Sequence, residues 1–167
     1  PFACLLWADT PAIVRRSGRA GRSIQRIGLT VVGPLSGVYG AIVGTAVERV
    51  IVTASDGRAI DVLVRAGDDA TTVMLHMGTP NGLVALPDQW LGDHRSRLVL
   101  YARPGYARSD PQPGRSVADA AADTATIMDV LGVESFAAVG WSGGGPHALA
   151  CAALLPQRCL ATAIIAG

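Results

Sequence analysis

The clearest indication of the fold of this 167-residue chain is the stretch Phe136-Ala137-Ala138-Val139-Gly140-Trp141-Ser142-Gly143-Gly144. It begins as a short apolar run, which is typical of a buried strand, and leads into a helical pattern over residues 144–155. Its last five residues match G-x-S-x-G, the pattern of a serine held on a sharp strand-to-helix turn. We therefore expect Ser142 to adopt a strained, positive φ, with its side chain at the carboxyl end of the sheet. Gly140 and Gly144 lack the side chains that would collide in such a turn.

Two backbone amides near Ser142 are candidate donors to an oxyanion. The N–H of Gly143 starts the predicted helix, where unpaired amides and the positive end of the helix dipole favour an anion. The second candidate is the N–H of Thr79, in the loop His76-Met77-Gly78-Thr79-Pro80-Asn81. Two simpler interpretations stay open: Ser142 as an ordinary helix-capping residue, and the loop as a plain Gly-Pro turn.

Strand and helix patterns alternate through residues 47–167. We expect strands at residues 49–53, 59–64, 72–76, 98–101, 136–139 and 160–165, with a hairpin turn at Asp56-Gly57. We expect helices at residues 86–95, 116–131 and 144–155, the second starting with a capping-box-like Ser116 and Asp119 and ending at Gly132. A hairpin followed by β-α units predicts an α/β fold, with a mostly parallel sheet and helices on both faces.

Three motifs in this order resemble the α/β-hydrolase fold family, specifically the N-terminal part of a proline iminopeptidase-like or esterase-like serine hydrolase. They are Met77-Gly78-Thr79-Pro80, Arg103-Pro104-Gly105-Tyr106-Ala107-Arg108-Ser109 and Gly140-Trp141-Ser142-Gly143-Gly144, and the resemblance covers about residues 48–167. Met77 stands where the family has His, and Ala107 where it has Gly. The Met77 departure removes a hydrogen bond expected to support the loop, for which neighbouring His76 is the substitute.

The resemblance implies that Ser142 is the acyl-accepting nucleophile and that Gly143 and Thr79 form the oxyanion hole. The sharp strand-to-helix turn at Ser142 is the nucleophile elbow of this family. The residues expected to support the elbow and the loop of residues 76–81 are Gly140, Gly144, Gly78, Pro80 and His76. Trp141 is either a wall of the acyl pocket or a packing residue, and Arg103 and Tyr106 are expected to be scaffolding for the loop.

The same resemblance bears on the reaction and its partners. A serine at the elbow argues against the haloalkane dehalogenase and epoxide hydrolase branches, which use an Asp nucleophile. The resemblance implies no metal and no organic cofactor. The expected partner is a small-molecule ester, amide or lactone.

The other two members of a catalytic triad are not evident in the chain. In this fold the order is Ser, then Asp or Glu, then His, yet the 25 residues after Ser142 contain no acid. Their one histidine, His147, is expected to pack within the helix, while His94 is expected in a solvated connection and His76 in a structural role. We therefore expect a truncated, nearly inert chain whose full-length parent is a serine hydrolase. The alternative is a non-catalytic binding or scaffold protein that has the elbow without a triad.

Charge divides the chain into two unlike pieces near Val47. Residues 1–46 carry five Arg and one Asp, whereas residues 47–167 carry nine Arg and twelve acidic residues, giving a net charge of +1. A net charge this close to zero creates no electrostatic field that would attract a polyanion, so nucleic acid is not an expected partner. Three cysteines without C-x-x-C spacing, Cys4, Cys151 and Cys159, indicate neither a disulfide framework nor a zinc site. A reducing compartment, the cytoplasm, is the expected location.

Residues 1–46 allow three interpretations. Residues 27–47 form a 21-residue run without charge, long enough to cross a bilayer, and they follow a basic stretch at residues 15–26. The segment is a membrane anchor or export signal, a structured extension of the domain, or non-native sequence upstream of the true start. We expect it to pack weakly against residues 47–167, with Val31, Val32 and Leu35 outside the core.

Overall fold

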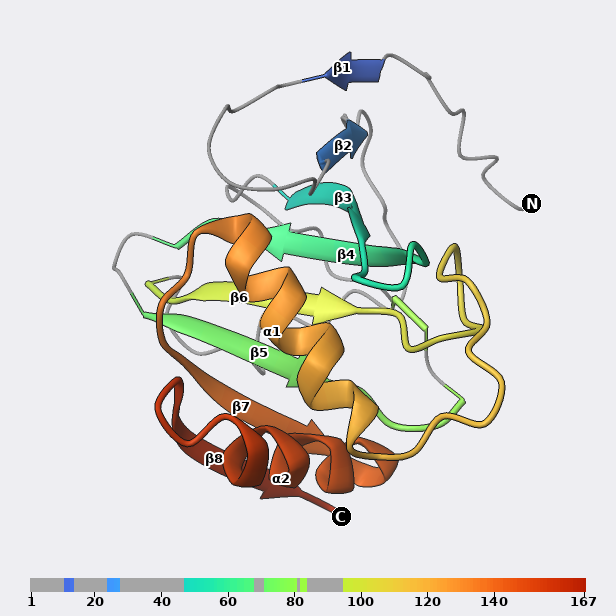
Figure 1. The fold of residues 1–167 in the computed structure, drawn as a ribbon. Helices are drawn as coiled ribbons and strands as arrows, with labels where there is room; N and C mark the ends of the chain where they lie inside the picture. The colour runs from blue at the N-terminus through green and yellow to red at the C-terminus, as the bar shows by residue number, and fades with distance from the viewer. Residues whose placement is uncertain (1–10, 14–23, 28–46, 68–70, 81, 84–94) are drawn as a thin grey trace, which may run out of the picture.

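The computed structural model describes residues 11–13, 24–27, 47–67, 71–80, 82–83 and 95–167. Their strands join one mixed sheet in the order β1-β2-β3-β4-β6-β5-β7-β8 (Figure 1). The strands are β1 (Pro11–Ile13), β2 (Ile24–Ile27), β3 (Val47–Thr53), β4 (Ala59–Arg65), β5 (Thr72–His76), β6 (Arg97–Tyr101), β7 (Phe136–Trp141) and β8 (Cys159–Ile165). The helices are α1 (Asp119–Leu131), the 3₁₀ turn η2 (Ser142–Gly144) and α2 (Gly145–Leu154).

The antiparallel part of the sheet is built on the predicted hairpin. β3 and β4 pair in register from Val47 and Arg65 to Thr53 and Ala59. At the turn, Gly57 adopts a φ of +88° and donates its N–H to the carbonyl of Ala54 at 3.0 Å. A positive φ suits glycine because it has no Cβ, which explains why Asp-Gly is a reliable turn signal.

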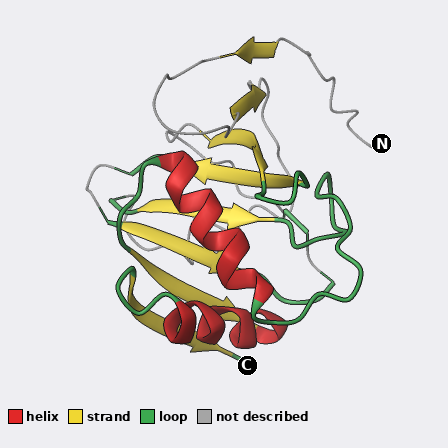
Figure 2. Cartoon of the chain, in the orientation of Figure 1, coloured by secondary structure: helices red, strands yellow, loops and turns green. Residues whose placement is uncertain are grey.

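The parallel part of the sheet carries the other predicted strands. β6, β5, β7 and β8 run parallel to one another, and β6 joins the hairpin through an antiparallel pairing with β4. Helices α1 and α2 lie side by side over one face of this sheet (Figures 1 and 2). The predicted helix at residues 86–95 falls almost wholly on residues 84–94, outside the described ones, so the cover of the second face is not described. The predicted α/β class is confirmed.

The core forms where the two helices meet the sheet. Its fully buried side chains include Met74 and Val99 of the sheet and Ile127 and Met128 of α1. α1 ends as predicted, because Gly132 takes a left-handed φ of +68° that few other residues adopt readily. The start of α1 differs from the prediction, because the helix begins at Asp119 with Ala118 as its N-cap and not at Ser116. The Asp119 carboxylate accepts the N–H of Ser116 at 2.6 Å and its hydroxyl at 2.9 Å, so the two residues are joined just before the helix.

Residues 1–46 contribute two short strands at the edge of the sheet. β2 pairs antiparallel with β3, and β1 with β2. Val31, Val32 and Leu35 lie outside the described residues, so the expectation that they avoid the core stays a prediction, as does the domain division at Val47. In the described part of the chain, no helix has the length and apolarity needed to span a bilayer.

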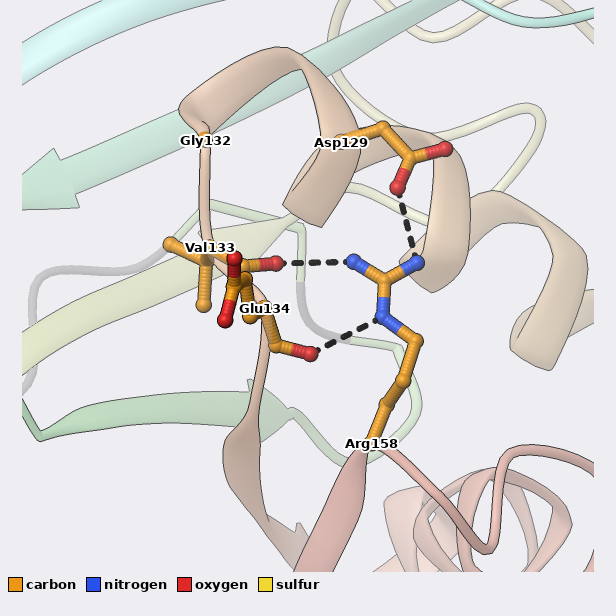
Figure 3. A pocket seen from close by; sticks show the side chains of 5 residues that line it. All are labelled: Asp129, Gly132, Val133, Glu134 and Arg158. Carbon is orange, nitrogen blue, oxygen red and sulfur yellow. Dashed lines mark hydrogen bonds and ion pairs between the residues drawn. The ribbon is translucent and has the colours of Figure 1, made fainter.

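Arg158 links by hydrogen bonds the chain segments that precede β7 and β8. Arg158 donates to the carbonyls of Val133 and Glu134 at 2.8 and 3.1 Å and to the Asp129 carboxylate at 2.8 Å (Figure 3). These groups and Gly132 line an open depression, in which the guanidinium of Arg158 is held by neighbours of its own chain. We therefore interpret these residues as structural. The depression lies at the opposite end of β7 from Ser142.

Candidate active site

Ser142 lies at the turn between β7 and α2, as predicted. Its φ is +46°, and the residue is exposed at the carboxyl end of β7. The parallel strands β5 and β8 end at the same edge of the sheet. Ser142 therefore lies at the edge where ligands of open α/β sheets usually bind.

The elbow glycines allow backbone segments to approach closely. A Cβ on Gly144 would lie 1.8 Å from the carbonyl oxygen of His76, and one on Gly140 would lie 2.6 Å from the Cα of Gly145. Gly78 lies near the serine at a less restrictive distance, since its Cβ would be 3.2 Å from the Cβ of Ser142. The turn therefore depends on glycine at Gly140 and Gly144, which is the supporting role predicted for them.

The structure brings Gly143 and Thr79 together beside Ser142. A Cβ on Gly143 would lie 3.3 Å from the backbone nitrogen of Thr79 and 3.0 Å from its Oγ1. The two residues proposed as oxyanion donors thus belong to adjacent backbone segments, one following β7 and the other β5. Pro80 follows Thr79 through a cis peptide bond and is exposed.

Arg103 holds the loop that carries Thr79. Its Nη1 donates to the carbonyl of Met77, and its Nη2 donates to the carbonyl of Gly78 at 3.3 Å and to Thr79 Oγ1 at 3.0 Å. The side chain is buried, and the guanidinium carbon lies 5.8 Å from the centre of the Tyr106 ring. Burial lowers the pKa of Arg103 from its usual value. Arg103 is therefore the scaffold for the loop that the sequence predicts.

The loop containing Arg103 is itself anchored on β4 through a buried carboxylate. Asp61 is fully buried, accepts Arg49 Nε at 2.7 Å and accepts the N–H of Arg108 at 3.1 Å. Ser109 Oγ accepts the N–H of Asp61 at 2.9 Å and donates to the carbonyl of Ala102 at 2.6 Å. Sequence analysis does not identify this network, although a lone Asp within the strand pattern AIDVLV is a signal that could have suggested it.

His76 differs from its expected hydrogen-bonding role. Its imidazole is buried, with Nε2 3.4 Å from Cys151 Sγ, while Nδ1 has no partner among the described residues. Burial is the main cause that lowers its pKa to about 3, with His147 and Arg103 adding to the effect, so the ring is neutral. Because its side chain points toward α2, His76 does not replace the hydrogen bond missing at Met77. That support comes from Arg103, and His76 meets the elbow through its carbonyl.

His147 is tied to the helix rather than to the serine. Its Nδ1 lies 3.0 Å from the carbonyl of Gly143, and because a carbonyl can only accept, Nδ1 carries the proton. Burial lowers the pKa of His147. Among the described residues, no hydrogen bond joins Ser142 to an imidazole or a carboxylate, and His94 lies outside them. The burial of His147 and its bond to the Gly143 carbonyl agree with the packing role expected for it.

Trp141 lies close to the loop, since its Cδ1 is 3.2 Å from the position of a Cβ on Gly78. The residue is partly exposed, so its role as a pocket wall stays a prediction. Across the described ranges, no group of three or more His, Cys, Asp or Glu side chains could hold a metal ion.

Comparison with known proteins identifies the family. The family described as alpha/beta hydrolase fold matches residues 73–167, which is more than half of the chain. The chain therefore belongs to the alpha/beta hydrolase fold family. A relative from Bacillus subtilis (strain 168), the uncharacterized hydrolase YcgS, is 29% identical over 116 residues. That alignment covers 66% of this chain and 39% of YcgS.

Solved structures show the same fold at low sequence identity. A predicted CIB-like hydrolase from Thermoplasma acidophilum superposes with a TM-score of 0.61 at 15% identity, covering 72% of this chain and 63% of that one. An epoxide hydrolase from an endophytic Streptomyces gives a TM-score of 0.56 at 21% identity, covering 73% and 37%. The chain thus spans less than two thirds of the length of these relatives.

Proposed function

We propose that the chain carries the nucleophile and the oxyanion hole of a serine hydrolase of the proline iminopeptidase-like or esterase-like kind. In this proposal the whole protein transfers an acyl group from an ester, amide or lactone to water. The observation that carries it is Ser142, exposed at a φ of +46° between β7 and α2. A strained non-glycine residue at a strand-to-helix turn points to function, because such a backbone costs of order 1–3 kcal/mol.

The chemistry follows from the groups around the serine. Attack by the Ser142 hydroxyl on a carbonyl carbon would form a bond to Oγ and place negative charge on the carbonyl oxygen. The amides of Gly143 and Thr79 would bind that oxygen, and one such donor is worth about 2.7–4 kcal/mol. A general base must accept the hydroxyl proton, because a serine hydroxyl alone is a weak nucleophile. Some structural relatives are epoxide hydrolases, but the resemblance assigns an Asp nucleophile to that branch, and the elbow here has Ser142.

Labelling with a fluorophosphonate tests the proposal on the whole protein. We expect one covalent adduct, found by mass spectrometry on the peptide containing Ser142. The adduct should disappear in Ser142→Ala and persist in Ser116→Ala, a matched change of another exposed serine. Labelling that persists in Ser142→Ala would overturn the assignment. A whole protein that no fluorophosphonate labels would favour the alternative, a non-catalytic binding or scaffold protein.

A further inference from the structure

The guanidinium of Arg103 is a buried cation that is held by dipoles. The residue is 4% exposed, and its hydrogen-bond acceptors are two backbone carbonyls and one hydroxyl, with the Tyr106 ring beside it. Among the described residues, its contacts include no carboxylate. Buried charges are usually paired, because their desolvation is costly. An arginine placed in this way therefore needs an explanation beyond stability.

The position of the cation relative to one peptide group supplies that explanation. The carbonyl of Gly78 and the N–H of Thr79 belong to the same planar trans peptide unit, so they point in opposite directions. Arg103 Nη2 donates to the Gly78 oxygen on one side of this unit. The Thr79 nitrogen lies near Gly143 and the elbow. A hydrogen bond accepted by the carbonyl polarises the peptide group and makes its N–H a stronger donor.

We propose that Arg103 is a positioning residue that orients and polarises the Gly78–Thr79 peptide, so that the Thr79 N–H binds the oxyanion. This inference rests on the proposed function, since it concerns the same oxyanion hole. Arg103 also donates to Thr79 Oγ1 and to the Met77 carbonyl, which fixes the rotation of the peptide plane. Lysine would keep the charge, but it lacks the planar fork of donors that meets these three acceptors at once.

Kinetics of the whole protein with p-nitrophenyl acetate test the inference. We expect Arg103→Ala and Arg103→Lys to lower kcat about tenfold or more, with little change in KM, because the interaction acts on the charge formed in the transition state. Millimolar guanidinium should restore part of the rate of Arg103→Ala and leave the wild type and Ser142→Ala unchanged. Arg158→Ala is the matched control. It removes an arginine that also binds two carbonyls, at the other end of β7, and should lower the melting temperature without changing kcat.

The outcomes separate this inference from the proposed function. Activity that survives Ser142→Ala would overturn the proposed function. Activity that is lost in Ser142→Ala but unchanged in Arg103→Ala, measured below the melting temperature, would overturn the inference alone. An equal loss of kcat in Arg158→Ala would also overturn it, since the effect would then come from general stability.

A spectroscopic measurement tests the same polarisation without catalysis. In the 167-residue chain, we expect the amide proton of Thr79 to shift upfield in Arg103→Lys, because the hydrogen bond at the Gly78 carbonyl is lost or weakened. Arg158→Ala should leave this resonance in place. A Thr79 amide resonance that is the same in Arg103→Lys, Arg103→Ala and the wild type would contradict the inference.

Discussion

Gly144 allows the first turn after the elbow to lie directly on the end of β5. A Cβ there would lie 1.8 Å from the His76 carbonyl oxygen, a backbone atom that cannot rotate away. We therefore expect Gly144→Ala to lower the free energy of unfolding by about 3 kcal/mol, the upper part of the range for overpacking. Urea denaturation measures the change. Gly82→Ala is the control, because its Cβ would meet its nearest neighbour at 3.8 Å and should change stability by less than about 0.5 kcal/mol. Equal midpoints for the two variants would contradict the assigned geometry.

His76 makes the stability of the chain depend on pH below neutrality. Its pKa is about 3 in the folded state and 6.5 in the unfolded chain, so the unfolded state binds more protons between these values. Stability is therefore greatest above about pH 6.5 and falls as the pH is lowered through that range. We expect the urea midpoint to decrease from pH 7.5 to pH 5.0, and to decrease less in His76→Gln. The lowered pKa of His147 acts in the same direction, so some dependence should remain. An identical slope in His76→Gln would show that the ring is not buried as described.

At the scale of elements, two aspartates of α1 contrast a buried ion pair with an exposed one. Asp123 accepts Arg58 Nη2 at 2.8 Å and joins α1 to the β3–β4 hairpin, with 4% of its side chain exposed. Asp129 pairs with Arg158, and 39% of its side chain is exposed. We expect Asp123→Ala to destabilise the fold by about 3 kcal/mol, because it leaves a mostly buried guanidinium with one acid fewer. Asp129→Ala should cost about 1 kcal/mol or less. Thermal unfolding of both variants checks the ranking, and a reversed order would refute it.

The elements of this fold could be predicted because their signals are local. Apolar runs bounded by turn residues predict β3 to β8, since such runs of four to eight residues are typical of strands. β1 and β2 are not predicted, because strands of three and four residues have too short a pattern. The elbow is predictable for the same local reason, as its glycines and serine are adjacent in sequence.

Contacts between distant segments could not be predicted. Asp61 meets Arg49 because the register of β3 against β4 places them diagonally on one face. The side chain of His76 turns toward Cys151 because α2 covers that face of β5. The hydrogen bonds from Arg103 to residues 77–79 likewise depend on how two loops meet at one edge of the sheet. The sequence suggests which residues matter in the candidate site, and the packing decides which of them touch.

In the molecule as a whole, Ser142 and the two amides proposed as oxyanion donors lie at one edge of the sheet, and none of the described residues is placed to act as a base for the serine. His76 lies against Cys151, and His147 donates to the Gly143 carbonyl. In the described part of the chain, the Ser142 hydroxyl makes no hydrogen bond with an imidazole or a carboxylate. Oxyanion binding alone leaves only about 10³–10⁴-fold acceleration over water, provided that the substrate pocket is intact.

We therefore expect the 167-residue chain by itself to form no stable adduct with a fluorophosphonate within the time that fully labels an intact serine hydrolase in the same tube. Ser142 would keep its proton, so its oxygen would attack phosphorus too slowly for intact-mass spectrometry to record the product. Turnover of short p-nitrophenyl esters should likewise stay at the buffer rate. Rapid labelling that disappears in Ser142→Ala would contradict this expectation and point to an unusual base. In that case His147→Ala and His76→Ala would decide between the two imidazoles, since only loss of the acting base would abolish the labelling while the chain stays folded by circular dichroism.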